Sequence, residues 1–237
     1  MSKVSLSVIV PTYNNGKNIE NSISSILEQE CPLNLNIDCK IIIVDDASLD
    51  DKFNEVKDLY ANHNNIKILR NKENRGPAFS RNRGLKNAKG QYISFLDADD
   101  LWTKDRLKNI FPKFQDPQID IVTGKTQQKI AKNLAYIGYE KHNATELRWD
   151  LVGSLVLKRK IIDQGFFFDE EMRLGEDTEW RARLLKAGFK CEDIDNTTLV
   201  RWIHGSNTTL TSKFTHKEIL MKILHKSINE NRKNKAI

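Results

Sequence analysis

Residues 4–14 (VSLSVIVPTYN) and residues 40–48 (KIIIVDDAS) decide the fold class of this chain. Each begins as a run of apolar and β-branched residues and ends in polar residues, which is typical of a buried strand in a parallel sheet. Between the two runs, Ile19, Ile23 and Ile26 recur at helical spacing. A strand, a helix and a second strand in this order predict a βαβ unit with a right-handed crossover.

The alternation of strand-like and helix-like segments continues along the chain. We expect further strands at 66–69, 92–96, 119–122 and 153–157, an irregular strand over 125–139, and helices at 50–61, 77–88, 103–114, 159–164 and 176–186. This order predicts an α/β fold with a doubly wound, mostly parallel central sheet and helices on both of its faces. Residues 213–231 carry an apolar stripe at helical spacing and predict a C-terminal helix.

The composition indicates a folded chain. Hydrophobic residues make up 39% of the 237 residues, which is enough for a core and argues against global disorder. No run of 18 apolar residues occurs, and polar residues follow the N-terminus too soon for a signal peptide, so we expect a cytoplasmic protein. Cys31, Cys39 and Cys191 form no CxxC pair and no even set, which predicts buried free thiols.

The positive charge is concentrated at the C-terminus. Of the net charge of +6, residues 213–237 carry +5, from seven basic and two acidic side chains. The nearly neutral remainder argues against a nucleic-acid partner. Two interpretations of the tail stay open: a helix packed on the domain or on a second copy in a homodimer, or peripheral contact with anionic lipid at the inner face of the cell membrane.

Polar side chains cluster where three of the expected strands end. Residues 11–15 follow the first strand, residues 45–48 the second, and residues 97–100 the strand at 92–96. The carboxyl ends of parallel strands meet at one edge of a sheet, which is where such folds bind ligands. Five carboxylates in the last two segments repel one another unless a cation, hydrogen-bond donors or a hydroxyl-rich ligand is present. Helix capping and loop solvation are the plain alternative.

Six segments together resemble glycosyltransferase family 2 over residues 4–210. They are, in order, SVIVPTYNN, VDDAS, NRGPAFSRNRG, FLDADDLW, RLGEDTEWRARLLKAGF and RWIHGSN. The resemblance implies a GT-A fold in a single domain, 1–212, with a nucleotide-sugar-binding half (1–115) and an acceptor-binding half (116–212). It also implies a nucleotide-diphosphate sugar donor, a divalent Mn²⁺ or Mg²⁺ ion, and inverting transfer of one sugar to a glycan or lipid-linked acceptor, as in cell-surface polysaccharide synthesis.

The resemblance assigns the donor-binding residues. It implies that Asp45 accepts a hydrogen bond from the ring N–H of the base, which favours uridine and hence a UDP-sugar, and that Asp97, followed by Ala98, reaches the ribose or the sugar. Asp99 is the implied metal ligand. The remaining residues assigned to the nucleotide sugar are Pro11, Thr12, Tyr13, Asn14, Asp46, Gly76 and Arg81.

Several of these assignments leave alternatives open. Asp46 is either a site residue or a loop acceptor, and Asp100 is either a helix N-cap or a second metal ligand. Arg81 either contacts phosphate or pairs with Asp97 or Asp46. Trp102 and Trp149 either stack on a sugar or belong to the core or a lid.

The catalytic residues fall at the start of the helix expected over 176–186. An inverting transfer needs a base for the proton of the acceptor hydroxyl, and Asp177 matches the position that the family uses. Glu176 orients the acceptor or caps the helix. His204 resembles the late-chain metal ligand of some GT-A enzymes, with an ordinary solvated histidine as the alternative.

Two other functions compete with this interpretation. A nucleotidyltransferase of related architecture needs a Gly-rich phosphate loop after the first strand, and PTYNNGKN contains no GxG. A catalytically silent sugar-nucleotide-binding or scaffold protein would keep the fold and lose the DxD motif or the Glu-Asp pair. Both are present here, as Asp97-Ala98-Asp99 and Glu176-Asp177. The sequence predicts neither the donor sugar nor the linkage.

Overall fold

The computed structural model describes residues 2–130, 146–148, 151–203 and 221. Strands β1 (Ser2–Thr12), β2 (Leu35–Asp45), β3 (Ile66–Arg70) and β4 (Tyr92–Phe95) alternate with helices α1 (Ile19–Leu27), α2 (Lys52–Tyr60) and α3 (Pro77–Asn87). The second half contains β5 (Leu101–Trp102), α4 (Arg106–Ile110), the 3₁₀ helix η1 (Phe111–Gln115), β6 (Ile121–Ile130), β7 (Glu146–Arg148), the 3₁₀ helix η4 (Val152–Ser154), β8 (Leu155–Lys158), α5 (Lys160–Asp163), α6 (Glu176–Lys186) and β9 (Cys191–Ile203).

The strands form one mixed sheet in the order β3-β2-β1-β4-β8-β6-β9-β5, with β7 paired to β6. The pairings β3–β2, β2–β1 and β1–β4 are parallel, as predicted for the first hundred residues. The second half corrects the expectation of a mostly parallel sheet, because β8 runs antiparallel to both β4 and β6, and β5 runs antiparallel to β9. Between β6 and β8, the described residues contain only β7 and the 3₁₀ helix η4 and not the long helix of a parallel crossover, so these two neighbouring strands run antiparallel.

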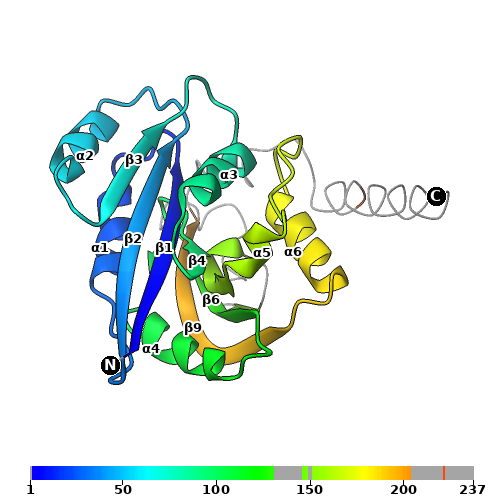
Figure 1. Ribbon diagram of the computed structural model, residues 1–237. Coiled ribbons are helices and arrows are strands. Elements are labelled where there is room, and N and C mark those ends of the chain that lie inside the picture. The colour runs from blue at the N-terminus through cyan, green and yellow to red at the C-terminus, as the bar shows by residue number, and fades with distance from the viewer. Residues whose placement is uncertain (1, 131–145, 149–150, 204–220, 222–237) are drawn as a thin grey trace.

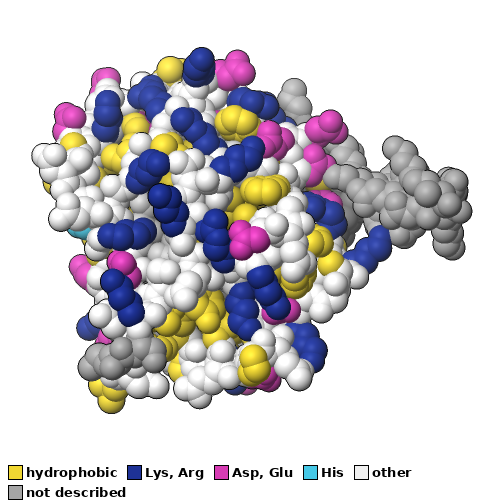
Figure 2. Space-filling view, in the orientation of Figure 1, with side chains coloured by type: hydrophobic (Ala, Val, Ile, Leu, Met, Phe, Trp, Pro, Cys, Tyr) yellow, Lys and Arg dark blue, Asp and Glu magenta, His cyan; other side chains and the backbone are white. Residues whose placement is uncertain are grey.

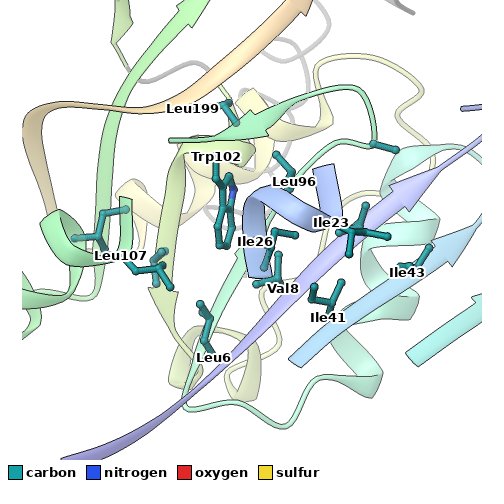
Figure 3. Packing of buried hydrophobic residues seen from close by; sticks show 14 of the residues in the cluster. Leu6, Val8, Ile23, Ile26, Ile41, Ile43, Leu96, Trp102, Leu107 and Leu199 are labelled. Carbon is teal, nitrogen blue, oxygen red and sulfur yellow. The ribbon is translucent and has the colours of Figure 1, made fainter. Parts of the chain in front are cut away.

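Helices cover both faces of the sheet (Figure 1). On β1, Leu6, Val8 and Val10 face α1, α2 and α4, whereas Ile9 faces α3, α5 and α6. Figure 3 shows Val8 packed among Ile23 and Ile26 of α1 and Ile41 and Ile43 of β2. Alternate residues of a strand point to opposite faces, so the two apolar clusters follow from the sequence pattern of the strands.

Three expectations for local structure need correction. The helix expected over 103–114 is a short α4 followed by η1, because Pro112 lacks the N–H that an α-helix would use there. Strand β9 was not expected at all. Of the three free thiols, Cys31 is exposed and Cys39 and Cys191 are half-buried, so the prediction of buried cysteines was wrong for Cys31.

Other expectations are confirmed or lie outside the described residues. Trp102 is buried among Leu96, Ile26 and Leu199, which is its core interpretation. The expected C-terminal helix at 213–231, Trp149 and His204 lie outside the described residues. Within the described residues, no helix is both long and apolar enough to cross a membrane.

Candidate active site

The loops after β1 and β2 are held together at the carboxyl edge of the sheet, at the top of Figure 1. The Asp46 amide donates to the Thr12 carbonyl oxygen (2.8 Å), and the Asn14 amide donates to Ser48 Oγ (2.9 Å). Asn14 Oδ1 in turn accepts from the Leu49 amide (2.8 Å). Both loops contain a non-glycine residue with positive φ, Asn14 at 50° and Ala47 at 62°, which is uncommon outside functional loops and tight turns. Tyr13 remains 45% exposed beside them.

Asp45 is buried at the end of β2. Its Oδ1 accepts from the Ser48 amide (3.0 Å), and its Oδ2 lies 3.3 Å from Arg70 Nε in an ion pair. Oδ2 accepts no hydrogen bond within the described structure. A buried carboxylate oxygen in this state has unused acceptor capacity, and the half-exposed Arg70 side chain covers it.

Asp46 connects the β2 loop to the start of α3. Its carboxylate accepts from Asn71 Nδ2 (2.6 Å), the Arg75 amide (3.0 Å) and the Gly76 amide (2.7 Å). Gly76 has φ of 88°, and a Cβ there would lie 2.9 Å from an Arg173 guanidinium nitrogen, so the turn requires glycine. Of the two alternatives for Asp46, the structure shows the loop acceptor.

Arg81 of α3 lies between two carboxylates from distant parts of the chain. Its guanidinium donates to Asp97 Oδ1 (2.8 Å) in the loop after β4 and to Glu176 Oε1 (2.6 Å) at the start of α6. Its side chain is nearly inaccessible, and the guanidinium lies 5.6 Å from the centre of the Phe168 ring, which stacks on Trp180. Arg81 therefore pairs with Asp97, as one alternative predicted, and with Glu176, which was not foreseen.

The charges around Arg81 perturb one another. Burial disfavours the charged guanidinium, but the carboxylates of Asp97, Glu176 and Asp177 outweigh that effect and raise the pKa of Arg81 above its usual range. Burial raises the pKa of Glu176, and the Arg81 charge opposes this shift. The site thus holds a charged guanidinium beside the buried Glu176, a carboxyl group of reduced acidity.

Asp177 follows Glu176 in the first turn of α6, which begins after Gly175 in a left-handed conformation (φ 75°). Burial raises the pKa of Asp177, while Arg81 and the Thr178 amide, which donates to Asp177 Oδ1 (2.8 Å), oppose the shift. A carboxylate whose pKa is raised is a stronger base, which suits a residue that accepts a proton.

The loop at 97–100 follows β4 at the same edge. The Asp97 side chain is 40% exposed, and Asp99 is half-buried. Asp100 is buried, and its Oδ1 accepts from the Trp202 amide (3.1 Å) of β9. Burial, together with the charges of Asp99 and Asp97, raises the pKa of Asp100 well above its usual range. The N-cap interpretation of Asp100 is wrong, because α4 begins only at Arg106.

The acidic loop fits one kind of metal site. Among the described residues, no three His, Cys, Asp or Glu side chains converge as a preformed metal cage. Mg²⁺ and Mn²⁺ are hard cations that enzymes commonly hold through one or two carboxylates together with the phosphates of the substrate. Asp99, with Asp97 two residues away, is a donor set of that type.

Sequence reasoning missed the residues that support the site. Asn82 holds the loop before α6, because its Nδ2 donates to the Phe168 carbonyl oxygen (2.9 Å) and its Oδ1 accepts from the Phe168 amide (2.8 Å). Asn71 holds Asp46 and also accepts from Arg83 (2.6 Å). The only signal in the sequence was the polar segment SRNRG inside an otherwise helical pattern.

Comparisons with known proteins identify the family and the fold. The family described as "Glycosyl transferase family 2" matches residues 7–178. The minor teichoic acid biosynthesis protein GgaA of Bacillus subtilis is 37% identical over 198 residues, which cover 76% of this chain and 43% of that protein. The putative teichuronic acid biosynthesis glycosyltransferase TuaG of the same organism is 38% identical over 103 residues, which cover 44% of this chain and 39% of that protein. The chain thus spans less than half the length of either relative.

Solved structures share the fold. The structure of TarS from S. aureus in complex with UDP-GlcNAc has a TM-score of 0.70 at 21% identity, over 92% of this chain and 64% of that chain. A mannosyltransferase from Pyrobaculum calidifontis in complex with GDP-Man and Mn²⁺ has a TM-score of 0.65 at 22% identity, over 87% of this chain and 59% of that chain. Because the family match covers well over half of the described fold, this chain belongs to glycosyltransferase family 2.

Proposed function

We propose that this chain is an inverting, metal-dependent glycosyltransferase that moves one sugar from a UDP-sugar to a hydroxyl of a glycan or lipid-linked acceptor. The observation that carries the proposal is the Arg81 bridge, which joins Asp97 of the donor loop to Glu176 beside Asp177. The names of the relatives support an acceptor in cell-surface polysaccharide synthesis, because they include teichoic acid and teichuronic acid biosynthesis proteins. We assign the activity to residues 1–212 as one domain.

The nucleotide would lie across the ends of β1 and β2. Tyr13 offers an exposed ring on which a base can stack, beside Pro11, Thr12 and Asn14. The unused acceptor capacity of Asp45 Oδ2 suits a ring N–H of uracil once the Arg70 side chain moves aside. Asp46 and Gly76 shape the adjoining turn through their hydrogen bond, and Ala98 lets the loop approach the sugar closely.

We assign the divalent ion to Asp99, with His204 as a further ligand. Such an ion would stabilise the negative charge that develops on the diphosphate as it leaves. The TarS structure with UDP-GlcNAc and the mannosyltransferase structure with GDP-Man and Mn²⁺ support a nucleotide sugar and a divalent metal. UDP binding measured with each ion distinguishes Mn²⁺ from Mg²⁺.

The chain's own residues supply the proton chemistry. Asp177 takes the proton of the acceptor hydroxyl as its oxygen forms a bond to the anomeric carbon and the bond from that carbon to the diphosphate breaks. A single displacement from the face opposite the diphosphate inverts the anomeric configuration. Arg81 holds Glu176 by an ion pair, so that Glu176 keeps the first turn of α6, and with it Asp177, facing the donor loop.

Calorimetric titration with UDP, with and without Mn²⁺ or Mg²⁺, tests the proposal. We expect metal-dependent binding in the wild-type chain and its loss in Asp99→Ala. Asp163→Ala removes an exposed carboxylate in α5 and serves as the matched control, with unchanged binding. A wild-type chain that binds neither UDP nor its guanosine and thymidine counterparts would overturn the enzyme function in favour of a catalytically silent scaffold.

A further inference from the structure

The segment from 66 to 90 has an exceptional charge. It contains eight Lys and Arg residues and a single acidic residue, Glu73, a net charge of +7 within 25 residues. The net charge of residues 1–212 does not reveal this cluster, because these residues are nearly neutral as a whole. The segment comprises β3, α3 and the loop between them, so its charge is gathered on one part of the surface.

Three of the eight cations are neutralised by carboxylates from elsewhere in the fold. Arg70 pairs with Asp45, Arg75 pairs with Glu170, and Arg81 pairs with Asp97 and Glu176. These pairs belong to the donor edge and to the loop before α6. Among the described residues of this segment, Lys67, Lys72, Arg83 and Lys89 have no carboxylate partner, and their charge is the part that needs an explanation.

We name these four side chains, together with Lys86, the cationic face: Lys67, Lys72, Arg83, Lys86 and Lys89. Lys67 Nζ donates to the amide oxygen of Asn87 (2.8 Å) and Arg83 donates to the amide oxygen of Asn71 (2.6 Å), so both are positioned without being neutralised. Within the described ranges, Lys67, Lys72, Arg83 and Lys89 form no ion pair.

Lys67, Arg83 and Lys86 of the cationic face lie close together near the end of α3. Arg83 and Lys86 are three residues apart on α3, and Asn87, which follows Lys86, receives Lys67 from β3. Figure 2 shows Lys and Arg side chains gathered over α3 and the elements beside it, with few acidic side chains among them. Like charges at this spacing repel, which favours a partner of opposite charge.

The position of the cationic face on α3 favours a flat partner. Arg81 and Arg83 are two residues apart on α3 and so point to different sides of the helix, Arg81 toward Glu176 and the half-buried Arg83 toward Asn71. A polyanionic chain held along the outer side would have to turn around the helix to reach Asp177. A planar anionic surface can touch the outer side of α3 while the donor edge stays beside it.

We propose that the cationic face docks this chain on anionic lipid headgroups. The attraction acts between exposed charges, so it weakens as salt screens them. This inference goes beyond the proposed function, since vesicle binding is measured without any sugar donor. It also differs from contact through residues 213–237, because it places the surface on α3 and β3.

Flotation of the full chain with lipid vesicles tests the inference. We expect binding to phosphatidylcholine vesicles that contain phosphatidylglycerol, no binding to phosphatidylcholine alone, and release at high salt. The variant Lys67→Gln/Lys72→Gln/Lys86→Gln/Lys89→Gln should lose at least tenfold in vesicle affinity. The control Lys57→Gln/Lys104→Gln/Lys108→Gln/Lys113→Gln removes the same charge from the α2 and α4 side of the sheet and should keep nearly full affinity.

Three results would overturn the inference, provided that circular dichroism shows both variants to be folded. One is undiminished vesicle binding by the cationic-face variant, which would assign the contact to other residues such as 213–237. Another is an equal loss in both variants, which would mean that only net charge matters. The third is the absence of vesicle binding together with tight binding of soluble polyphosphate that the cationic-face variant loses, which would make the partner a polyanionic chain.

Discussion

Among the described residues, Arg81 alone forms ion pairs with both Asp97 and Glu176. Asp97 lies 16 residues and Glu176 lies 95 residues from it in sequence, and both distances to the guanidinium are below 3 Å. Removing the guanidinium would leave Glu176 buried without its counter-ion, a change that typically costs about 3–5 kcal/mol. Lysine is a poor substitute, because one ammonium group cannot reproduce a planar fork that serves two carboxylates.

A pH profile tests this arrangement at the residue scale. Because burial raises the pKa of Asp177, we expect the acidic limb of kcat/KM to lie above the ordinary aspartate pKa of about 3.9, with activity lost as pH falls through it. The Arg81 charge lowers the pKa of Asp177, so Arg81→Gln should move the limb to still higher pH and reduce kcat. Rates measured across pH with a UDP-sugar donor give the position of the acidic limb and kcat for the wild type and for Arg81→Gln.

The control for the pH profile lies on the same helix. Arg83 is half-buried, donates to Asn71 and has neither Glu176 nor Asp177 as a partner, so Arg83→Gln should leave the acidic limb in place. A limb that stays in place in Arg81→Gln as well, in a folded variant, would contradict the assignment of Asp177 as the base next to Arg81.

At the scale of the element, α3 depends on one close approach to the sheet. A Cβ added at Gly84 would lie 2.4 Å from Ile9 Cγ2 of β1, which is too short for any contact between carbon atoms. The glycine therefore lets α3 lie directly on β1, and this position sets where Arg81 and Asn82 project. Alanine would favour the helix by propensity, so only packing explains glycine here.

The prediction for α3 is that Gly84→Ala destabilises the fold. Overpacking of this kind costs about 1–3 kcal/mol, against a helix-propensity gain of about 1 kcal/mol. Urea unfolding followed by circular dichroism measures the change, with Lys86→Ala, exposed on the same helix, as a near-neutral control. If Gly84→Ala were as stable as the wild type and bound UDP equally well, the close packing would not matter.

Strand β9 shows how an element can depend on its neighbours. Of its sequence, CEDIDNTTLVRWI, the first six residues are mostly polar, whereas Thr197–Ile203 contains β-branched and aromatic residues that favour strands. The strand forms because it pairs with β6 over most of its length and with β5 at Leu199 and Val200, while Asp100 accepts from the Trp202 amide. The local sequence therefore indicates a strand only in the second half of β9, and the first half depends on partners that are remote in sequence.

On the scale of the whole molecule, the two halves of the sequence share one sheet and one site. Strand β4 of the first half pairs with β8 of the second, and Arg81 joins the donor loop to α6. A donor bound between the loops would add contacts to both halves. We therefore expect donor binding to stabilise both halves of the fold against unfolding.

Thermal unfolding checks this coupling. UDP with Mn²⁺ at about 100 times its dissociation constant should stabilise the folded chain by about 2.7 kcal/mol, which appears as a higher Tm. Chelation of the metal with EDTA should reverse the shift, because the diphosphate contact then lacks its cation. A rise in Tm with UDP that EDTA leaves unchanged would argue against the metal site at Asp99.

By itself, the sequence determined the βαβ alternation of the first hundred residues, the acidic strand ends and the family, because these depend on local periodicity and on short motifs. Only the tertiary structure decided that Arg81 meets Glu176, that Asp46 accepts from the loop before α3 and that β9 completes the sheet. The physical reason is that ion pairs and strand pairs between distant segments depend on which side chains the packed sheet brings within about 3 Å, and this distance has no signature in a local pattern.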